Sequence, residues 1–400
     1  MFPALKCARH VVDCPRCNFA VEFLGEQIPR LDQFICPNCG TPCSPSSMEL
    51  RPPDKFPIQT IDGGSKVDRW EVIAFADPRS DGYLVKRVIG LPGEQISFDA
   101  GNLMVDQRLV RKPYHSNWMA VLPTVFQFDE RIRLQPERFA ALNDDTNWVL
   151  CEHDLKFVGG SVPPDVRKGK RPSRYDAAHP AFIAGDEVND EIDWLLYRHR
   201  KCYFRNAAST PHTIDDFYGI NHHLTRETNS VCEIAIRLSL ECVERGILVL
   251  RIHDGFEYHT FDIDFDDICL RYRDKSFAIP FQVGAKKPLD LTVWLIDQQL
   301  DFIIDEIPIV HVEFERQGGG EAVADVAALG GVSGEFIIRD FSLHRDWFLF
   351  DPRSEPTHTW SLAQGEYFVV GDNLPISRDS REWQGRHLTR AQILGRIKHR

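Results

Sequence analysis

Apolar and polar residues alternate along much of the second half of the chain, a pattern typical of β-strands with one buried and one solvent-facing side. In residues 232–241, the apolar side chains of Ile234, Ile236, Leu238 and Leu240 share one face. Similar runs follow at 247–252, 258–265, 268–272, 289–296, 300–304, 310–314 and 336–343. Short strands joined by turns predict a β-sandwich over about 214–350. Residues 317–334 are rich in Gly and Ala, so we expect a flexible loop there within the sandwich.

Shorter strand-like segments lie near both ends of the chain. Residues 70–75 and 83–90 are rich in β-branched and aromatic side chains, and a Leu-Pro-Gly-Glu turn follows the second of them. Near the C-terminus, residues 367–370 and 393–397 have the same character and flank a polar turn. The predicted fold class is therefore mainly β.

Composition narrows the class of protein further. The chain has 400 residues, of which 43% are hydrophobic and 26% are charged, so a disordered or fibrous chain is excluded and two or three domains are expected. The net charge of −12 and the pI near 5.7 argue against a protein that coats nucleic acid, and we expect no nucleic-acid partner. No apolar run reaches the roughly 18 residues that a membrane helix needs.

Cysteines are concentrated near the N-terminus. Cys14 and Cys17 form one C-x2-C pair, and Cys36 and Cys39 form a second. Two such turns aim four thiolates at one point, which is the pattern of a tetrahedral structural Zn²⁺ site. A segment this short cannot build a core unaided, so bound zinc would supply its folding free energy. We therefore predict a zinc ribbon; two disulfides or four free thiols are the alternatives.

Two motifs far apart in the sequence resemble the signal peptidase I family of serine proteases. The sequence YLVKRVIGLPGE at residues 83–94 is similar to the lysine box of that family. The sequence GDNLPISRDSREW at residues 371–383 is similar to its closing box. Either motif alone is weak evidence for the resemblance, but the presence of both motifs in the order found in the family is specific evidence. The resemblance implies a β-rich protease core and a Ser–Lys catalytic dyad, with no cofactor needed for catalysis.

The resemblance assigns the general base to Lys86. A lysine amine has a pKa near 10.4, so action near neutral pH requires that pKa to fall by about three units. Burial among apolar groups has this effect, and the neighbours of Lys86 on its expected strand are largely apolar. In the family, Asp372 would pair with Arg87, and Ser377 would hydrogen-bond near the amine. The supporting site residues that the resemblance implies are Arg87, Asp372, Asn373, Ser377, Asp379 and Arg381.

The nucleophile is the difficult assignment. The sequence MFPAL at residues 1–5 resembles the family's nucleophile motif, S-M-x-P-[ST]-L, without its serine. We therefore expect the catalytic serine and a membrane helix just upstream of Met1, unless this protein has lost both. The alternative within the chain is Ser47, which precedes Met48 but lacks the proline of the motif.

The domain organisation follows from these segments. Residues 1–45 are the expected zinc ribbon. Residues 46–112 and 351–400 would together form the protease core, split by an insertion at 113–350. The β-sandwich of about 214–350 within that insertion resembles concanavalin-A/laminin-G-like jelly rolls.

Two functions are compatible with this organisation. The first is a signal-peptidase-I-like serine endopeptidase that cleaves signal peptides from exported preproteins at the extracytoplasmic face of a membrane, held there by a segment upstream of Met1. The second is a catalytically inactive protease-fold protein whose β-sandwich binds a glycan or protein partner.

Overall fold

The computed structural model describes residues 8–24, 33–53, 55–62, 64–76, 82–114, 116–159, 170, 172–174, 191–201, 211–217, 228–280, 287–316, 318–352, 358–383 and 387–397. These residues form a mainly β protein, and the α-helix among them, α1 (Ser116–Met119), is a single turn. Within the described part of the chain, no helix has the length and apolar character needed to cross a membrane. Residues 1–5, which carry the MFPAL sequence, lie outside the described residues.

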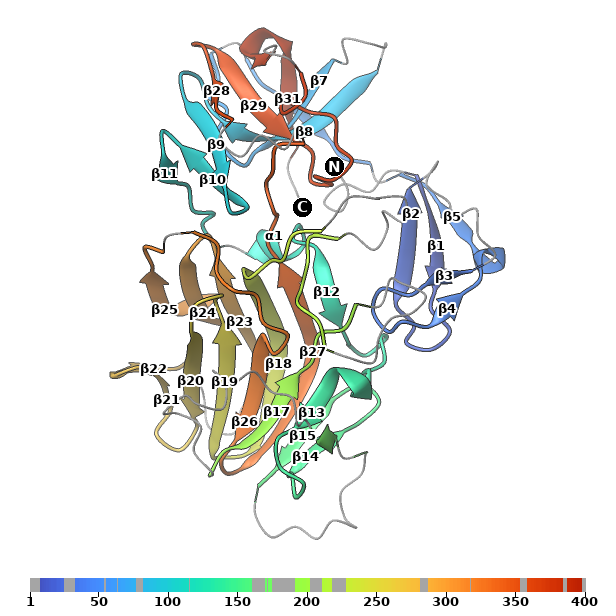
Figure 1. Cartoon of the computed structure of the whole chain (residues 1–400), viewed down its shortest axis with the longest axis vertical. Helices are drawn as coiled ribbons and strands as arrows, with labels where there is room; N and C mark the ends of the chain where they lie inside the picture. The colour runs from blue at the N-terminus through green and yellow to red at the C-terminus, as the bar shows by residue number, and fades with distance from the viewer. Residues whose placement is uncertain are drawn as a thin grey trace.

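The largest unit is a sandwich of two eight-stranded sheets, drawn in the lower part of Figure 1. The first sheet has the order β14 (Trp148–Leu150), β15 (Leu155–Val158), β27 (Glu335–Arg345), β18 (Ile234–Glu244), β23 (Leu289–Ile296), β24 (Gln299–Ile304) and β25 (Ile307–Glu313), and β12 (Thr124–Gln127) also pairs with β27. The second has the order β16 (Ser173–Arg174), β13 (Phe139–Ala141), β17 (Asp193–Tyr197), β26 (Ala327–Gly331), β19 (Ile247–His253), β20 (Tyr258–Asp264), β21 (Cys269–Tyr272) and β22 (Lys275–Ala278).

The facing sides of the two sheets bury one hydrophobic core, to which Ile236 and Leu238 of β18 contribute with Phe261 of β20. The expected mainly β fold with a sandwich is confirmed. Strands β12 to β17 also join these sheets, so the sandwich includes residues well before 214. Those strands are short, at most five residues, so they carry little alternation from which a sequence pattern can be recognised.

The prediction of a flexible loop over residues 317–334 is wrong in its second half. Residues 327–331 form β26, an interior strand whose five residues are all buried. A Cβ on Gly331 would lie 2.2 Å from the ring of Phe157, and one on Gly330 would lie 2.6 Å from Ile192. Glycines therefore occur here because the side chains of Phe157 and Ile192 occupy the space that a Cβ would need.

Segments from both ends of the chain share the upper, six-stranded sheet in Figure 1. Its order is β30 (Leu388–Thr389), β29 (Glu366–Val370), β8 (Tyr83–Gly90), β7 (Val72–Ala76), β31 (Ile393–Ile397) and β6 (Ile58–Thr60). A four-stranded sheet beside it has the order β11 (Arg108–Leu109), β10 (Asn102–Val105), β9 (Gln95–Asp99) and β28 (Trp360–Ser361). In both sheets, strands that precede the sandwich in sequence pair with strands that follow it.

The N-terminal unit consists of two small sheets, β2 (Ala20–Leu24), β1 (Arg9–Asp13) and β5 (Glu49–Arg51) in one, and β3 (Phe34–Ile35) and β4 (Pro42–Cys43) in the other. Because β5 pairs with β1, this unit extends to Arg51, and Ser47 lies within it. The unit contacts the sandwich through Asn38, whose side chain exchanges two hydrogen bonds of 3.1 Å with the backbone of Gln127 on β12.

One hydrophobic cluster joins the six-stranded sheet to the end of the sandwich. It contains Phe368 of β29 together with Trp294 of β23. Trp118 of α1 lies within it, with its ring centroid 5.6 Å from that of Trp70 and 5.6 Å from that of Trp347. The sandwich therefore packs against the unit that contains both sequence motifs.

Candidate active site

Lys86 lies in the middle of β8, between β7 and β29. Its backbone partner on β7 is Ile73, and the next residue, Arg87, pairs with Val370 at the end of β29. Because side chains alternate along a strand, Lys86 and Arg87 point to opposite faces of the sheet. The chain leaves β29 directly into the polar turn at 371–383, so this turn lies beside Lys86.

Ser377 is the hydrogen-bond partner of the lysine. Lys86 Nζ donates to Ser377 Oγ over 2.7 Å, although the two residues are 291 positions apart. The Asn373 carbonyl fixes the turn by accepting the backbone N–H groups of Ile376 at 3.3 Å and Ser377 at 3.0 Å. The position of Gly371 matters because a Cβ there would lie 2.2 Å from Ser377 Oγ and 3.1 Å from Lys86 Nζ.

A buried ion pair braces this turn from within. Asp379 and Arg381 are both buried, and two guanidinium nitrogens of Arg381 donate to the Asp379 carboxylate at 2.8 and 2.9 Å. Arg381 also donates to the Leu374 carbonyl at 2.8 Å, and Asp379 accepts the backbone N–H of Gly371 at 3.1 Å. These bonds hold the backbone on both sides of Ser377.

On the opposite face of β8, Arg87 and Asp372 form a second buried pair. Nε and Nη2 of Arg87 donate to the two carboxylate oxygens of Asp372, each at 3.0 Å, and this bidentate geometry fixes both planar groups. The guanidinium carbon of Arg87 lies 5.3 Å from the ring centroid of Trp118 and 5.2 Å from that of Trp347. Sequence analysis did not single out these two tryptophans.

The surroundings of Lys86 favour the neutral amine. Burial lowers the pKa of Lys86 below its ordinary value, and the carboxylate of Asp379 partly offsets this by favouring the charged form. Of the apolar neighbours on the strand, Val88 is fully buried whereas Tyr83 is 67% exposed. Desolvation therefore comes from the inner end of β8 and from the turn, since the outer end of the strand is open to solvent.

Ser47 is not placed beside Lys86 by any described hydrogen bond. It is exposed at the end of a 3-10 turn in the N-terminal unit, and its Oγ donates to the Ser44 carbonyl at 3.2 Å. Among the described residues, the hydrogen bond of the Lys86 amine goes to Ser377. The structure thus brings Lys86, Arg87, Asp372, Asn373, Ser377, Asp379 and Arg381 together and leaves Ser47 apart from their hydrogen bonds.

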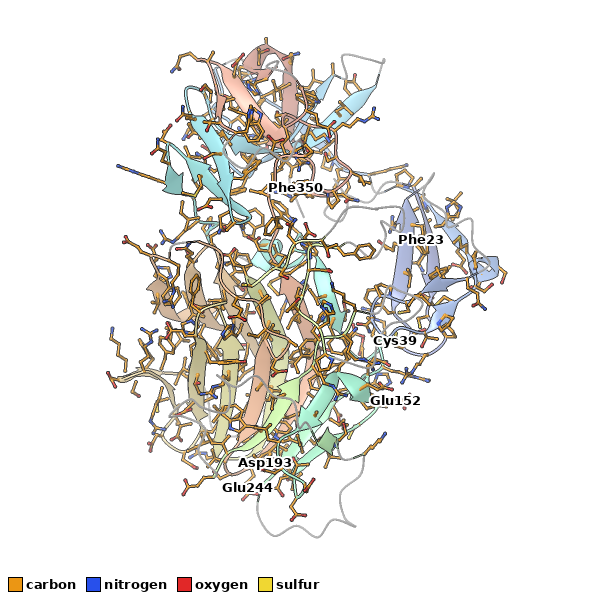
Figure 2. The ribbon with its side chains drawn as sticks, viewed as in Figure 1. Phe23, Cys39, Glu152, Asp193, Glu244 and Phe350 are labelled. Carbon is orange, nitrogen blue, oxygen red and sulfur yellow. The ribbon has the colours of Figure 1, made fainter. Side chains whose placement is uncertain are left out.

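The four predicted metal ligands form a separate cluster. The Sγ atoms of Cys14, Cys17, Cys36 and Cys39 lie within 4.8 Å of one another. The Cys14–Cys39 and Cys17–Cys36 sulfur distances are 3.5 and 3.7 Å. Tetrahedral Zn²⁺ with bonds of about 2.3 Å would place its sulfur ligands about 3.8 Å apart, so the residues fit this metal. Figure 2 shows Cys39 on the side of the N-terminal unit that faces the sandwich.

The two cysteine turns have the same backbone conformation. Asn18 donates its N–H to the Cys14 carbonyl and Gly40 donates to the Cys36 carbonyl, both over 2.8 Å. Asn18 and Gly40 also have left-handed φ angles of 62° and 76°. Asparagine and glycine tolerate this conformation well, so the local sequence favours both turns.

Comparisons with known proteins relate the two motif-bearing segments to a peptidase family. Residues 41–153 and 348–400 match the family model of signal peptidase, peptidase S26. The matched segments contain both sequence motifs and cover less than half of the chain. No curated protein matches the sequence.

Several solved structures resemble part of the chain weakly. The carbohydrate-binding module CBM66 from Bacillus subtilis is 7% identical, with a TM-score of 0.28, over 52% of this chain and 95% of the module. The galectin LEC-6 from Caenorhabditis elegans is 13% identical, with a TM-score of 0.22, over 29% of this chain and 84% of the galectin. A Bacillus subtilis protein with a galectin-like fold is 11% identical, with a TM-score of 0.24, over 40% of this chain and 85% of that protein. At these TM-scores the likeness says nothing about ligands.

Proposed function

We propose that this protein is a signal-peptidase-like serine endopeptidase that cleaves signal peptides from exported preproteins at a membrane, with Lys86 as its general base. The observation that carries the proposal is the half-buried amine of Lys86, 2.7 Å from a serine hydroxyl, with a pKa lowered by burial. A neutral amine in this position can accept the proton of a hydroxyl nucleophile.

In the proposed reaction, a serine Oγ attacks the carbonyl carbon of the scissile peptide bond while its proton passes to Lys86 Nζ. The resulting ammonium then gives this proton to the leaving amine as the C–N bond breaks, which leaves an acyl-enzyme. A water molecule attacks the ester carbonyl, and its proton passes through Lys86 back to the serine. Lys86 therefore ends each cycle neutral, as its buried position favours.

Ser377 is assigned the role of orienting the amine, because its turn is braced from within by Asp379 and Arg381. The nucleophile itself is proposed to be a serine upstream of Met1, as the MFPAL motif implies, with Ser47 as the alternative. Trapping the acyl-enzyme with a slow ester substrate, followed by peptide mapping, identifies the acylated serine directly. Acylation of Ser377 itself would contradict its assigned role.

The function is tested with a peptide that carries a signal-peptide cleavage site after small residues. The assay compares the 400-residue chain with a form extended by residues encoded before Met1. The extended form is expected to cleave, and Lys86→Met is expected to lower the rate by about 10²–10⁴-fold while preserving the circular dichroism spectrum. Lys66→Met, at an exposed lysine, is the matched control.

Failure of both forms to cleave such peptides, although folded, would overturn the proposal and favour a catalytically inactive protease fold that binds a partner. Full activity in Lys86→Met would remove Lys86 from the mechanism while leaving the peptidase function in place. For Cys14, Cys17, Cys36 and Cys39, we propose a structural Zn²⁺ that fixes the ribbon against the sandwich and takes no part in the reaction.

A further inference from the structure

Two tryptophans lie where the chain passes between the six-stranded sheet and the sandwich. Trp118 belongs to α1, which leads into β12, and Trp347 follows β27, the strand from which the chain leaves the sandwich. Both side chains are buried, and their ring centroids lie 5.6 Å apart with an angle of 75° between the ring planes. Neither residue belongs to the two sequence motifs, yet both contact Arg87, which follows Lys86 in the first motif.

The guanidinium of Arg87 is held on several sides. Nε and Nη2 donate to the Asp372 carboxylate, and Nη1 donates to the Trp70 carbonyl at 2.8 Å. The rings of Trp118 and Trp347 contact the same guanidinium, and a cation is attracted most strongly to an aromatic face where water is excluded. Arg87 and Asp372 are both buried, so the two rings stabilise a charged group that has lost its hydration.

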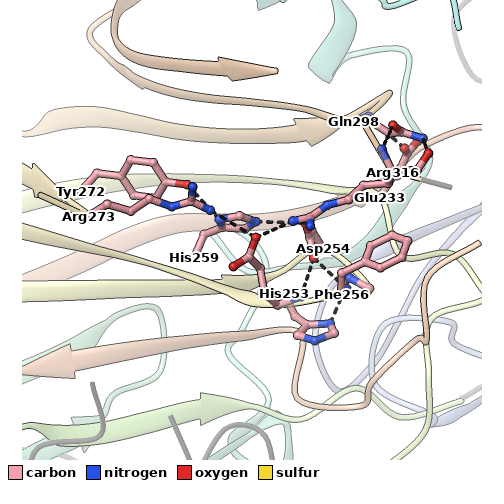
Figure 3. A network of polar contacts seen from close by, with 11 residues as sticks. Glu233, His253, Asp254, Phe256, His259, Tyr272, Arg273, Gln298 and Arg316 are labelled. Atoms are coloured by element: carbon pink, nitrogen blue, oxygen red, sulfur yellow. Dashed lines mark hydrogen bonds and ion pairs between the residues drawn. The ribbon is translucent and has the colours of Figure 1, made fainter. Parts of the chain in front are cut away.

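The end of the sandwich fixes the backbone next to Trp347. The preceding residue, Asp346, donates its backbone N–H to the Glu233 carbonyl at 2.9 Å, and its carboxylate lies 2.9 Å from Lys112 Nζ. The Glu233 carboxylate in turn accepts the backbone N–H of Gln298, in the β23–β24 turn, at 3.2 Å. Figure 3 shows Glu233 and Gln298 in a wider polar network at this end of the sandwich. The position of Trp347 therefore depends on hydrogen bonds and an ion pair that the sandwich provides.

Asp372 connects Arg87 to the polar turn that carries Ser377. The next residue, Asn373, accepts the backbone N–H of Ser377 with its carbonyl, so the position of Asp372 bears directly on that of the serine. The charged groups that act on the Lys86 amine all lie in the same turn: Asp372, Asp379, Arg381 and Glu382. A shift of the turn would therefore change both the hydrogen bond between Lys86 and Ser377 and the electrostatic field at the amine.

We propose that Trp118 and Trp347 are positioning residues of the peptidase site. Through their contacts with Arg87 they hold the polar turn, so that Ser377 stays against the Lys86 amine. This inference rests on the proposed peptidase function, in which that amine is the general base. The end of the sandwich thereby takes part in setting the geometry of a site whose reacting groups lie outside it.

Trp347→Leu tests this role in the extended form used for the peptidase assay. Leucine keeps an apolar side chain but removes the aromatic face from Arg87, so kcat is expected to fall by roughly tenfold or more. KM is expected to change little, because a buried side chain cannot touch the substrate. Trp347→Phe keeps an aromatic ring and is expected to recover most of kcat. Each rate is measured below the melting temperature of its variant.

Trp294→Leu is the matched control. Trp294 is buried in the same hydrophobic cluster, but its ring packs against Tyr114, with the centroids 5.6 Å apart. Its loss is expected to lower stability as the loss of any large buried side chain does, while kcat of the folded protein stays near that of the unmodified chain.

A second measurement does not require cleavage. Lysines of the 400-residue chain are tagged with isotope-labelled methyl groups, and the Lys86 signal, assigned by its absence from Lys86→Met, is titrated by NMR. Burial lowers the pKa of Lys86, so a turn loosened in Trp347→Leu is expected to admit water and raise that pKa towards the ordinary value. Trp294→Leu is expected to leave it unchanged.

An unchanged kcat or an unchanged Lys86 pKa in Trp347→Leu would overturn the positioning role. Equal effects in Trp294→Leu would overturn it as well, because they would reflect a general loss of stability. If no form cleaved the peptide, the peptidase proposal would fail, and the Lys86 pKa alone would decide whether the tryptophans position the surroundings of the amine.

Discussion

The amine of Lys86 lies 2.7 Å from the hydroxyl of Ser377, and one backbone pairing makes this possible. Strand β29 pairs with β8 so that Val370 lies beside Arg87, and the chain then turns at Gly371 into the loop that carries Ser377. The strands of the sandwich lie between β8 and β29 in the sequence. After the last of them, β27, the chain returns to the six-stranded sheet, where β29 pairs with β8. The candidate site is therefore a product of strand pairing between the two ends of the chain.

The pH dependence of peptidase activity tests the state of Lys86. Only the neutral amine can act as a base, and burial lowers its pKa below the ordinary value of about 10.4. Activity is therefore expected to be lost as pH falls through the Lys86 pKa and to reach a plateau above it, with an inflection in kcat/KM below the usual lysine range. Lys86→Arg keeps the charge but cannot lose its proton, so it is expected to be inactive at every pH. Activity in Lys86→Arg would contradict the assignment.

Gly371→Ala is expected to disturb the site although it leaves the side chains of Lys86 and Ser377 chemically unchanged. The added Cβ would lie 2.2 Å from Ser377 Oγ, so the hydroxyl must move away from Lys86. A displacement of about 1 Å costs on the order of 10²-fold in rate. The measurement is kcat, with Gly64→Ala as the control, because nothing lies within 4 Å of a Cβ at that position. Equal rates in the two variants would show that the Ser377 position does not matter.

Lys112 is expected to hold the junction between core and sandwich together. Its buried Nζ lies 2.6 Å from Asp297 and 2.9 Å from Asp346. Lys112→Met leaves both carboxylates buried without a counter-charge, which typically lowers the free energy of unfolding by about 3–5 kcal/mol. Lys66→Met, whose side chain is 81% exposed, is expected to leave the urea midpoint unchanged.

The decrease in the free energy of unfolding caused by Lys112→Met is also expected to depend on pH. Burial raises the pKa of Asp297 to about 6, so this group favours the folded state at low pH, and that contribution is lost as pH rises through about 6. Without Lys112 the carboxylates are tolerated only when protonated, so the variant is expected to be less stable at pH 8 than at pH 5. A deficit that did not grow with pH would argue against a charge-based role.

Removal of metal is expected to unfold the N-terminal unit alone. Elemental analysis should find one zinc per chain, lost in Cys36→Ser and retained in Cys43→Ala, because Cys43 stands outside the group of four ligands. Chelation should expose residues 8–51 to protease while the sandwich stays resistant, since the ribbon has only a small core of its own. A metal-free chain with a protease-resistant N-terminus would contradict the zinc proposal.

The strands of the sandwich were predictable where alternation is long and regular. In β18, Ile234, Ile236, Leu238 and Leu240 are all buried, as their period of two requires. The same rule fails for β26, where Gly330 and Gly331 look like loop residues. Their neighbours Trp194 and Phe157 come from distant strands, so only the packed structure shows why small residues are required there.

For the candidate site as well, some features follow from the sequence and others only from the tertiary structure. The sequence by itself determined the residues of the two motifs and the paired cysteines, because local spacing sets the chemistry of a C-x2-C turn and of a lysine on a strand. Only the tertiary structure decided that Lys86 meets Ser377 and that Trp118 and Trp347 cover Arg87. These contacts join residues far apart in sequence, and no local propensity encodes a distance between strands that meet only when the whole chain has folded.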